Sequence, residues 1–160
     1  MGAGGLSSYI NQLIIKYLRI IYFKMKDKKR FLFVCIENSN RSQMAQAFAR
    51  IHGGDAIEAF SAGSRPSGKI NPKAIEAMKL KGYDLTTHDS KSLQEIPMDK
   101  TYDYVVTMGC GDECPFVPAK HRLDWQIPDP RHMEMPEFLG VRDFIEGKIV
   151  DLLKESHQKA

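Results

Sequence analysis

The 160-residue chain is poor in cysteine, with only three, and an odd number without an export signal argues against an extracellular disulfide framework. It also has no internal repeats or low-complexity tracts, which excludes solenoid architectures. No apolar run is long enough to span a bilayer, because Lys16 and Arg19 interrupt the one candidate. The start of the chain shows no small-residue cleavage site of a secretory signal. We therefore expect one compact domain in a reducing compartment, the cytoplasm.

The chain also has little net charge. Its formal charge is +3, and residues 1–24 contain three bases (Lys16, Arg19 and Lys24) and no acid, so 3 minus 3 leaves the remainder neutral. A neutral domain lacks the basic footprint of a nucleic-acid-binding protein, and we expect no nucleic acid as a partner. Charged residues at 27% and hydrophobic residues at 42% are typical of an ordinary globular protein.

Residues 1–24 are interpreted as an N-terminal extension, either helical or the product of an upstream start, ahead of a single catalytic domain over residues 25–160. Six apolar residues of this extension share one face of a helix: Ile10, Leu13, Ile14, Tyr17, Leu18 and Ile21. Such a face leaves membrane contact through residues 8–24 open. An appendage or an upstream start is the favoured interpretation.

Strands alternate with helices along the rest of the chain. Strands are expected at 31–34, 57–60, 104–108 and 121–125, and helices at 42–51, 72–82 and 137–154. This alternation predicts an α/β fold with a four-stranded parallel sheet and helices on both faces. Ligands of such sheets bind beyond the carboxyl ends of the strands, where Cys35, Cys110 and Asp129 all fall.

The segment from Cys35 to Ser42, with the sequence CIENSNRS, is the most informative part of the chain. It connects an apolar strand to an amphipathic helix, so backbone N–H groups and the helix N-terminus converge where an oxyanion fits. The helix end and Arg41 favour the thiolate form of Cys35, which makes this sulfur a candidate nucleophile. A planar guanidinium suits two oxygens of a phosphate-like group. The alternative is that Cys35 is simply a small buried hydrophobe.

Cys35, Asn38, Arg41 and Ser42 resemble the C-x-x-N-x-x-R-S phosphate loop of low-molecular-weight protein tyrosine phosphatases and of the arsenate reductases built on the same fold. The stretches 41–45 (RSQMA) and 60–63 (FSAG) resemble the reductase branch. The resemblance implies a phosphatase-like fold and arsenate as the substrate. It also implies a set of substrate-binding residues in the loop: Glu37, Asn38, Ser39, Asn40 and Arg41. Glu37 departs from the pattern, since many relatives carry glycine there, and a carboxylate beside an oxyanion is unfavourable unless it points away.

Cys110 and Cys114 follow the third strand, and glycines flank Cys110. Reducing arsenate needs two electrons from a pair of thiols, whereas a phosphatase needs one thiol. The resemblance implies that Cys110 attacks the Cys35 sulfur and that Cys114 then attacks Cys110. An external thiol reductant, thioredoxin or a glutaredoxin-like carrier, is expected to reopen the final disulfide, with no bound cofactor.

Two other interpretations of this cysteine pair remain open. The side chains could simply pack, or they could form half of a metal site with His121 and His132. We expect no metal, because the spacings fit no zinc pattern.

Asp129 lies between two prolines and resembles the general acid of the family, which protonates the departing oxygen. A plain turn aspartate is the alternative, because Pro-Asp-Pro is also good turn chemistry.

Two other functions compete with arsenate reduction. A phosphotyrosine phosphatase would use the same Cys35, Arg41 and Asp129, although Arg131 and His132 stand where aromatic residues usually grip phosphotyrosine. A protein that captures arsenite or a soft metal without turnover would leave Arg41, Ser42 and Asp129 unexplained.

Overall fold

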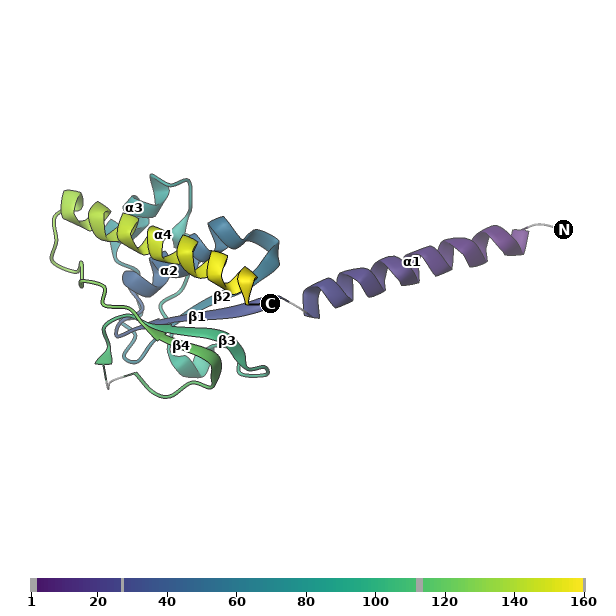
Figure 1. The fold of residues 1–160 in the computed structure, drawn as a ribbon. Helices are drawn as coiled ribbons and strands as arrows, with labels where there is room; N and C mark the ends of the chain where they lie inside the picture. The colour runs from purple at the N-terminus through teal and green to yellow at the C-terminus, as the bar shows by residue number, and fades with distance from the viewer. Residues whose placement is uncertain (1–2, 27, 112–113, 160) are drawn as a thin grey trace.

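The computed structural model describes residues 3–26, 28–111 and 114–159. A long helix, α1 (Ala3–Lys26), extends away from a compact body (Figure 1). The body contains four strands and three α-helices: β1 (Lys29–Cys35), α2 (Arg41–Gly53), β2 (Ile57–Gly63), α3 (Pro72–Lys79), β3 (Tyr102–Thr107), β4 (Ala119–Asp124) and α4 (Met135–Gln158). Short 3-10 turns interrupt the connections: η1 (Gly54–Ala56), η2 (Leu85–Thr87) and η3 (Leu93–Glu95).

The four strands form one sheet in the order β2-β1-β3-β4, and every pair of neighbours is parallel. This confirms the predicted four-stranded parallel sheet. In the register, Cys35 at the end of β1 lies opposite Gly63 at the end of β2. Thr107, which ends β3, lies opposite Val34, so the carboxyl ends of the three strands meet at one edge.

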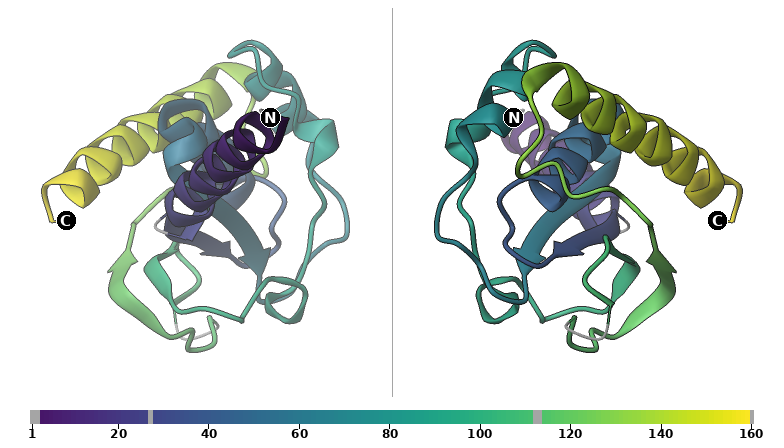
Figure 2. Two further views of the ribbon diagram at one scale, coloured as in Figure 1. Left: turned by 90° about the vertical axis from the view of Figure 1, so that its right-hand side faces the viewer. Right: turned by 90° about the vertical axis from the view of Figure 1, so that its left-hand side faces the viewer.

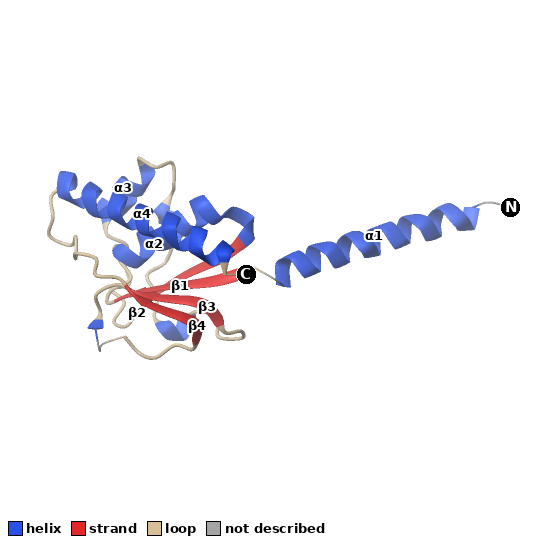
Figure 3. Cartoon of the chain, viewed as in Figure 1, coloured by secondary structure: helices blue, strands red, loops and turns tan. Residues whose placement is uncertain are grey.

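Both faces of the sheet are buried, and β1 supplies alternate residues to each. Phe31 and Phe33 pack under the helices, while Leu32 and Val34 belong to a second cluster on the other face. The helices α2, α3 and α4 all lie over the first face (Figures 2 and 3). The second face is covered by η3 and by loops. Helices were predicted on both faces of the sheet, and the structure has the three α-helices of the body on one face and a short 3-10 helix on the other.

The handedness of the crossovers explains the positions of α2 and of the second cluster, but not that of α3, which belongs to the β2-to-β3 connection, or of α4, which follows the last strand. Parallel strands are joined by right-handed crossovers in nearly all proteins. The β1-to-β2 connection crosses the sheet in one direction and carries α2 over the first face. The β2-to-β3 and β3-to-β4 connections cross in the opposite direction, and they deliver Ile96, Cys110 and Val117 to the second cluster.

Local sequence signals set the helix ends. Asn71 caps α3, because its side chain accepts a hydrogen bond from the backbone N–H of Lys73 at 2.9 Å, and Pro72 takes the first helical position. Gly82 follows with a φ of 77°, a left-handed conformation that favours glycine. Within the described ranges, no helix combines the length and apolarity needed to cross a membrane. The domain boundary drawn at residue 25 stays a prediction.

Candidate active site

A small pocket opens at the carboxyl edge of the sheet, where β1 passes into α2. Eight residues line it: Cys35, Ile36, Glu37, Ser39, Asn40, Arg41, Asp129 and Arg131. The structure thus brings together the cysteine, the arginine and the aspartate predicted from the sequence. Arg41 is the first residue of α2, so the partial positive charge of the helix N-terminus adds to its guanidinium. The pocket is suited to a small anion.

Cys35 is buried, with 3% of its surface exposed, and its Sγ lies 2.9 Å from the Oγ of Ser42. The Ser42 oxygen already accepts a hydrogen bond from the Nδ2 of Asn38 at 2.8 Å. The Ser42 hydroxyl proton is therefore free to point at the sulfur. Ser42 can thus donate a hydrogen bond to the Cys35 sulfur.

Asn38 is fully buried and does not line the pocket. Its φ of 49° is the one positive φ among the described non-glycine residues, a conformation that asparagine tolerates better than most side chains. Its amide also donates to Ser61 Oγ at 3.0 Å, and its Oδ1 accepts from the side chain of Gln43 and the backbone N–H of Lys91, each at 2.9 Å. These contacts fix the turn of the loop, and contact with the substrate stays a prediction for this residue.

Gln43 and His88 extend this network away from the pocket. The Nδ1 of His88 lies 2.8 Å from the Oε1 of Gln43, whose Nε2 donates to Asn38. The Nε2 of His88 lies 2.7 Å from the hydroxyl of Tyr83 and 3.2 Å from a guanidinium nitrogen of Arg50. Since Arg50 can only donate, His88 accepts there and donates from Nδ1, as a neutral imidazole. Burial, reinforced by the charge of Arg50, lowers the pKa of His88 to about 4.

Two glycines allow close approach of backbone or side chain to this loop. A Cβ on Gly63 would lie 2.6 Å from the carbonyl oxygen of Ile36, and a Cβ on Gly109 would lie 2.9 Å from the Nη1 of Arg41. The β3-to-β4 connection therefore lies directly against the arginine. Sequence reasoning placed Gly63 within a motif, but it missed the contact of Gly109 with Arg41, which joins residues far apart in the chain.

Arg41 is anchored on the loop that carries Asp129. Its Nη1 donates to the carbonyl oxygen of Ile127 at 3.2 Å, and its Nη2 lies 3.8 Å from an Asp129 carboxylate oxygen. The Asp129 side chain is 47% exposed, at the rim of the pocket. A carboxyl group there stands beside the guanidinium that would hold the anion, which is where a general acid is needed.

Glu37 does not leave an uncompensated charge in the pocket. Its carboxylate pairs with the Nη2 of Arg131 at 3.1 Å. Arg131 follows Asp129 by two residues, and its backbone N–H donates to Asp129 at 3.1 Å. The pair thus joins the phosphate loop to the loop of the expected acid, and no sequence signal other than opposite charge indicated it.

The other two cysteines form a disulfide with each other, with their Cα atoms 5.6 Å apart. Cys110 is buried at 4% exposure, and its Sγ lies 4.0 Å from the carbonyl oxygen of Val34, the residue before Cys35. Cys114 is only partly buried. The flanking Gly109 and Gly111 both have positive φ, so the connection is a turn that depends on glycine.

The structure pairs the two cysteines of the metal interpretation with each other. In the disulfide, neither sulfur is a thiolate ligand, and His121 stacks on Tyr104 with ring centroids 4.7 Å apart. Across the described residues, no three His, Cys, Asp or Glu side chains are grouped so that they could hold a metal ion.

The chain is similar to known proteins over most of its length. A family model described as low molecular weight phosphotyrosine protein phosphatase matches residues 30–160. Arsenate reductase 1 of Staphylococcus haemolyticus is 39% identical over 133 residues, which cover 81% of this chain and 98% of that protein. The arsenate reductase of Brevibacillus brevis is 38% identical over 128 residues, 78% of this chain and 94% of its own.

Solved structures give the same picture. An arsenate reductase in the phosphate-binding state superposes with a TM-score of 0.71 at 32% identity, covering 79% of this chain and 98% of its own. A thioredoxin-dependent arsenate reductase of Corynebacterium glutamicum superposes with a TM-score of 0.69 at 33% identity. That match covers 83% of this chain and 64% of the other.

Proposed function

The chain belongs to the low molecular weight phosphotyrosine protein phosphatase family, and we propose that within it this enzyme reduces arsenate to arsenite with electrons from its own thiols. The observation that carries the proposal is the disulfide of Cys110 and Cys114, whose buried sulfur lies against the residue before the nucleophile. Hydrolysis of a phosphate ester has no use for a second and third sulfur at this edge. The names of the similar proteins support the same activity.

The first step is attack of the Cys35 thiolate on arsenic(V). Arg41 and the loop hold the oxyanion, an As–S bond forms, and one arsenate oxygen leaves as water after taking a proton from Asp129. Ser42 donates to the sulfur before the attack. No electrons are transferred in this step.

The second step is the reduction. The thiolate of Cys110 attacks the Cys35 sulfur, a Cys35–Cys110 disulfide forms, and the electron pair of the S–As bond leaves with arsenic as arsenite. Two thiols have lost two electrons and arsenic(V) has become arsenic(III). The thiolate of Cys114 then attacks Cys110, which frees Cys35 as thiolate and leaves the Cys110–Cys114 disulfide.

An external dithiol completes the cycle, and we propose thioredoxin as this partner, with a glutaredoxin-like carrier as the alternative. The carrier meets Cys114 more readily than Cys110, because Cys110 is buried and Cys114 is partly exposed. On this scheme the enzyme has no resident cofactor and works in a reducing compartment, the cytoplasm.

A coupled assay tests the proposal. Arsenate-dependent NADPH oxidation is measured with thioredoxin and thioredoxin reductase, beside aryl-phosphate hydrolysis, for the natural chain, Cys110→Ser and Cys114→Ser. Arsenate turnover is expected in the natural chain alone, and Cys114→Ser is expected to release about one arsenite per enzyme. Strong aryl-phosphate hydrolysis, with no arsenate-dependent oxidation in the natural chain, would overturn the proposal in favour of a phosphatase.

A further inference from the structure

Helix α1 presents an apolar face that nothing in the described structure covers. The large apolar side chains on this face are 37% to 66% exposed: Ile10, Leu13, Ile14, Tyr17, Leu18 and Ile21. Neither core cluster of the described residues contains a residue of α1. Because helices in proteins gain most of their stability from packing an apolar face, this face requires an occupant.

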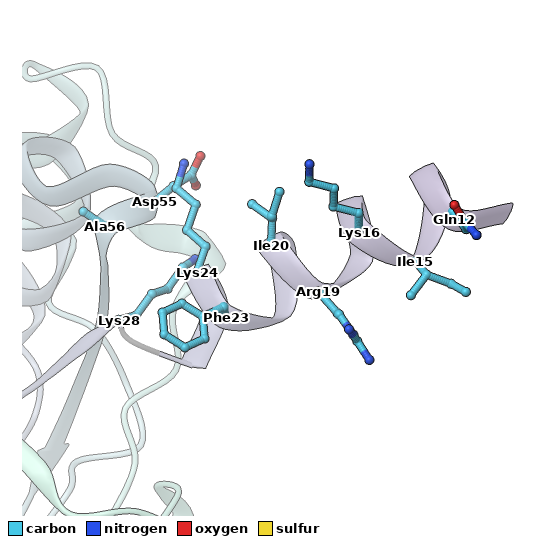
Figure 4. A pocket seen from close by; sticks show the side chains of 10 residues that line it. All are labelled: Gln12, Ile15, Lys16, Arg19, Ile20, Phe23, Lys24, Lys28, Asp55 and Ala56. Atoms are coloured by element: carbon cyan, nitrogen blue, oxygen red, sulfur yellow. The ribbon is translucent and has the colours of Figure 1, made fainter. Parts of the chain in front are cut away.

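The other side of α1, which borders the body, is mixed: it combines basic residues with three exposed apolar ones, Ile15, Ile20 and Phe23. The hollow between α1 and η1 is lined by ten residues, four of them basic (Figure 4): Lys16, Arg19, Lys24 and Lys28. None of the six residues of the apolar face lines this hollow. The apolar face therefore does not turn toward the body.

The charge of α1 has one sign. Residues 3–26 contain Lys16, Arg19, Lys24 and Lys26 and no acid. Tyr9, Tyr17 and Tyr22 add amphipathic rings, which favour the boundary between lipid and water. A helix with many exposed apolar residues, bases but no acids, and aromatic rings matches the anionic surface of a bilayer, in which it lies flat without crossing.

We propose that α1 binds the surface of a membrane containing anionic lipids. Its apolar face enters the boundary between headgroups and acyl chains, and its basic residues contact phosphate groups. The proposal does not depend on the reaction at Cys35, because α1 lies outside the region that the family model matches, residues 30–160.

Pairing with α1 of a second copy is the competing occupant. It would set four positive charges against four others with no acid among them, which is unfavourable. The charge of the helix therefore favours the lipid surface over a dimer.

Flotation of the full-length protein with vesicles tests the proposal. Vesicles of phosphatidylcholine with phosphatidylglycerol are compared with vesicles of phosphatidylcholine alone, for the natural chain, Leu13→Glu and Gln12→Glu. The two variants add the same charge at neighbouring positions, one on the apolar face and one on the mixed side that borders the body. The natural chain is expected to bind the anionic vesicles at least tenfold more tightly than the neutral ones.

Leu13→Glu is expected to lose more than tenfold in binding, and Gln12→Glu less than threefold. Replacing Lys16 and Arg19 with glutamine should cost about fivefold for each residue, and added salt should weaken binding. No binding by the natural chain, or equal losses in the two glutamate variants, would overturn the proposal. So would a dimer that Leu13→Glu dissociates in the ultracentrifuge while vesicles bind neither form.

Discussion

At the scale of single residues, the ion pair of Glu37 and Arg131 compensates the one carboxylate of the loop between Cys35 and Ser42. The carboxylate stands in the phosphate loop, and Arg131 compensates it at 3.1 Å. Removing the arginine in Arg131→Ala exposes the substrate to an unpaired negative charge, so we expect the KM for arsenate to rise by about tenfold. Initial rates over a range of arsenate concentrations measure this.

A double variant separates charge from structure in this pair. Glu37→Gln combined with Arg131→Ala removes both charges, and the KM should return to within about threefold of the natural value. If the double variant binds arsenate as poorly as Arg131→Ala, Arg131 acts on the substrate or on Asp129 directly and not through Glu37.

His88 makes the stability of the fold depend on pH. Its pKa is about 4 in the folded chain and about 6.5 when unfolded, so the unfolded chain takes up the proton first. The contribution of His88 to the free energy of unfolding is complete above about pH 6.5, and it falls by about 3 kcal/mol as the pH drops from 6.5 to 4. Urea unfolding at several pH values across this window measures the fall.

His88→Asn is the control for this prediction. An asparagine amide can still donate to Gln43 but does not titrate. The variant should unfold with a flatter dependence on pH between 6.5 and 4. An unchanged slope would mean that another group, and not His88, takes up the proton.

How much of the site was predictable depended on how local each signal was. Cys35, Arg41 and Ser42 stand within one short segment between an apolar strand and an amphipathic helix, and this local context indicated an anion pocket. Gln43 and His88 were missed because their importance arises from a contact between residues 45 positions apart. Sequence periodicity contains no information on such pairs.

At the scale of elements, the β3-to-β4 connection limits the position of the Arg41 side chain, because Gly109 lies directly against it. An added Cβ would meet the guanidinium at 2.9 Å, and the φ of 74° is also costly for alanine. Gly109→Ala should therefore displace Arg41, raise the KM for arsenate by about tenfold or more and lower the free energy of unfolding by about 1 kcal/mol.

Gly111→Ala is a matched control on the same connection. Its φ of 52° gives similar backbone strain, but a Cβ there would have no atom of the described residues within 4 Å. We expect a similar loss of stability by urea unfolding with a KM near the natural value. If both variants bind arsenate equally poorly, the effect comes from the shape of the connection and not from contact with Arg41.

The elements themselves were predictable, whereas the faces they cover were not. Apolar runs such as 31–34 and 104–108 identified β1 and β3, and Asn71-Pro72 identified the start of α3. The position of α2 on one face and of Ile96, Cys110 and Val117 on the other follows from strand order and crossover handedness. Strand order is a property of long-range pairing, which the pattern of a single strand does not specify.

At the scale of the whole molecule, we expect the catalytic body to fold and to reduce arsenate without α1. The buried hydrophobic core of the described residues runs from Phe31 to Leu153, and β1 begins at Lys29. We therefore expect a chain starting at Lys28 to keep the kcat and KM for arsenate within about twofold and to melt within about 3 °C of the full chain. Calorimetry and the coupled assay measure both.

A second, shorter chain serves as the control for this prediction. A chain starting at Phe33 loses half of β1, including the buried Phe31 and Leu32, and removing two such side chains costs several kcal/mol, about the whole stability of a domain. It should not fold. If the chain starting at Lys28 also fails to fold, α1 supports the body. If it folds and reduces arsenate but still floats with anionic vesicles, the membrane contact lies in the body and not in α1.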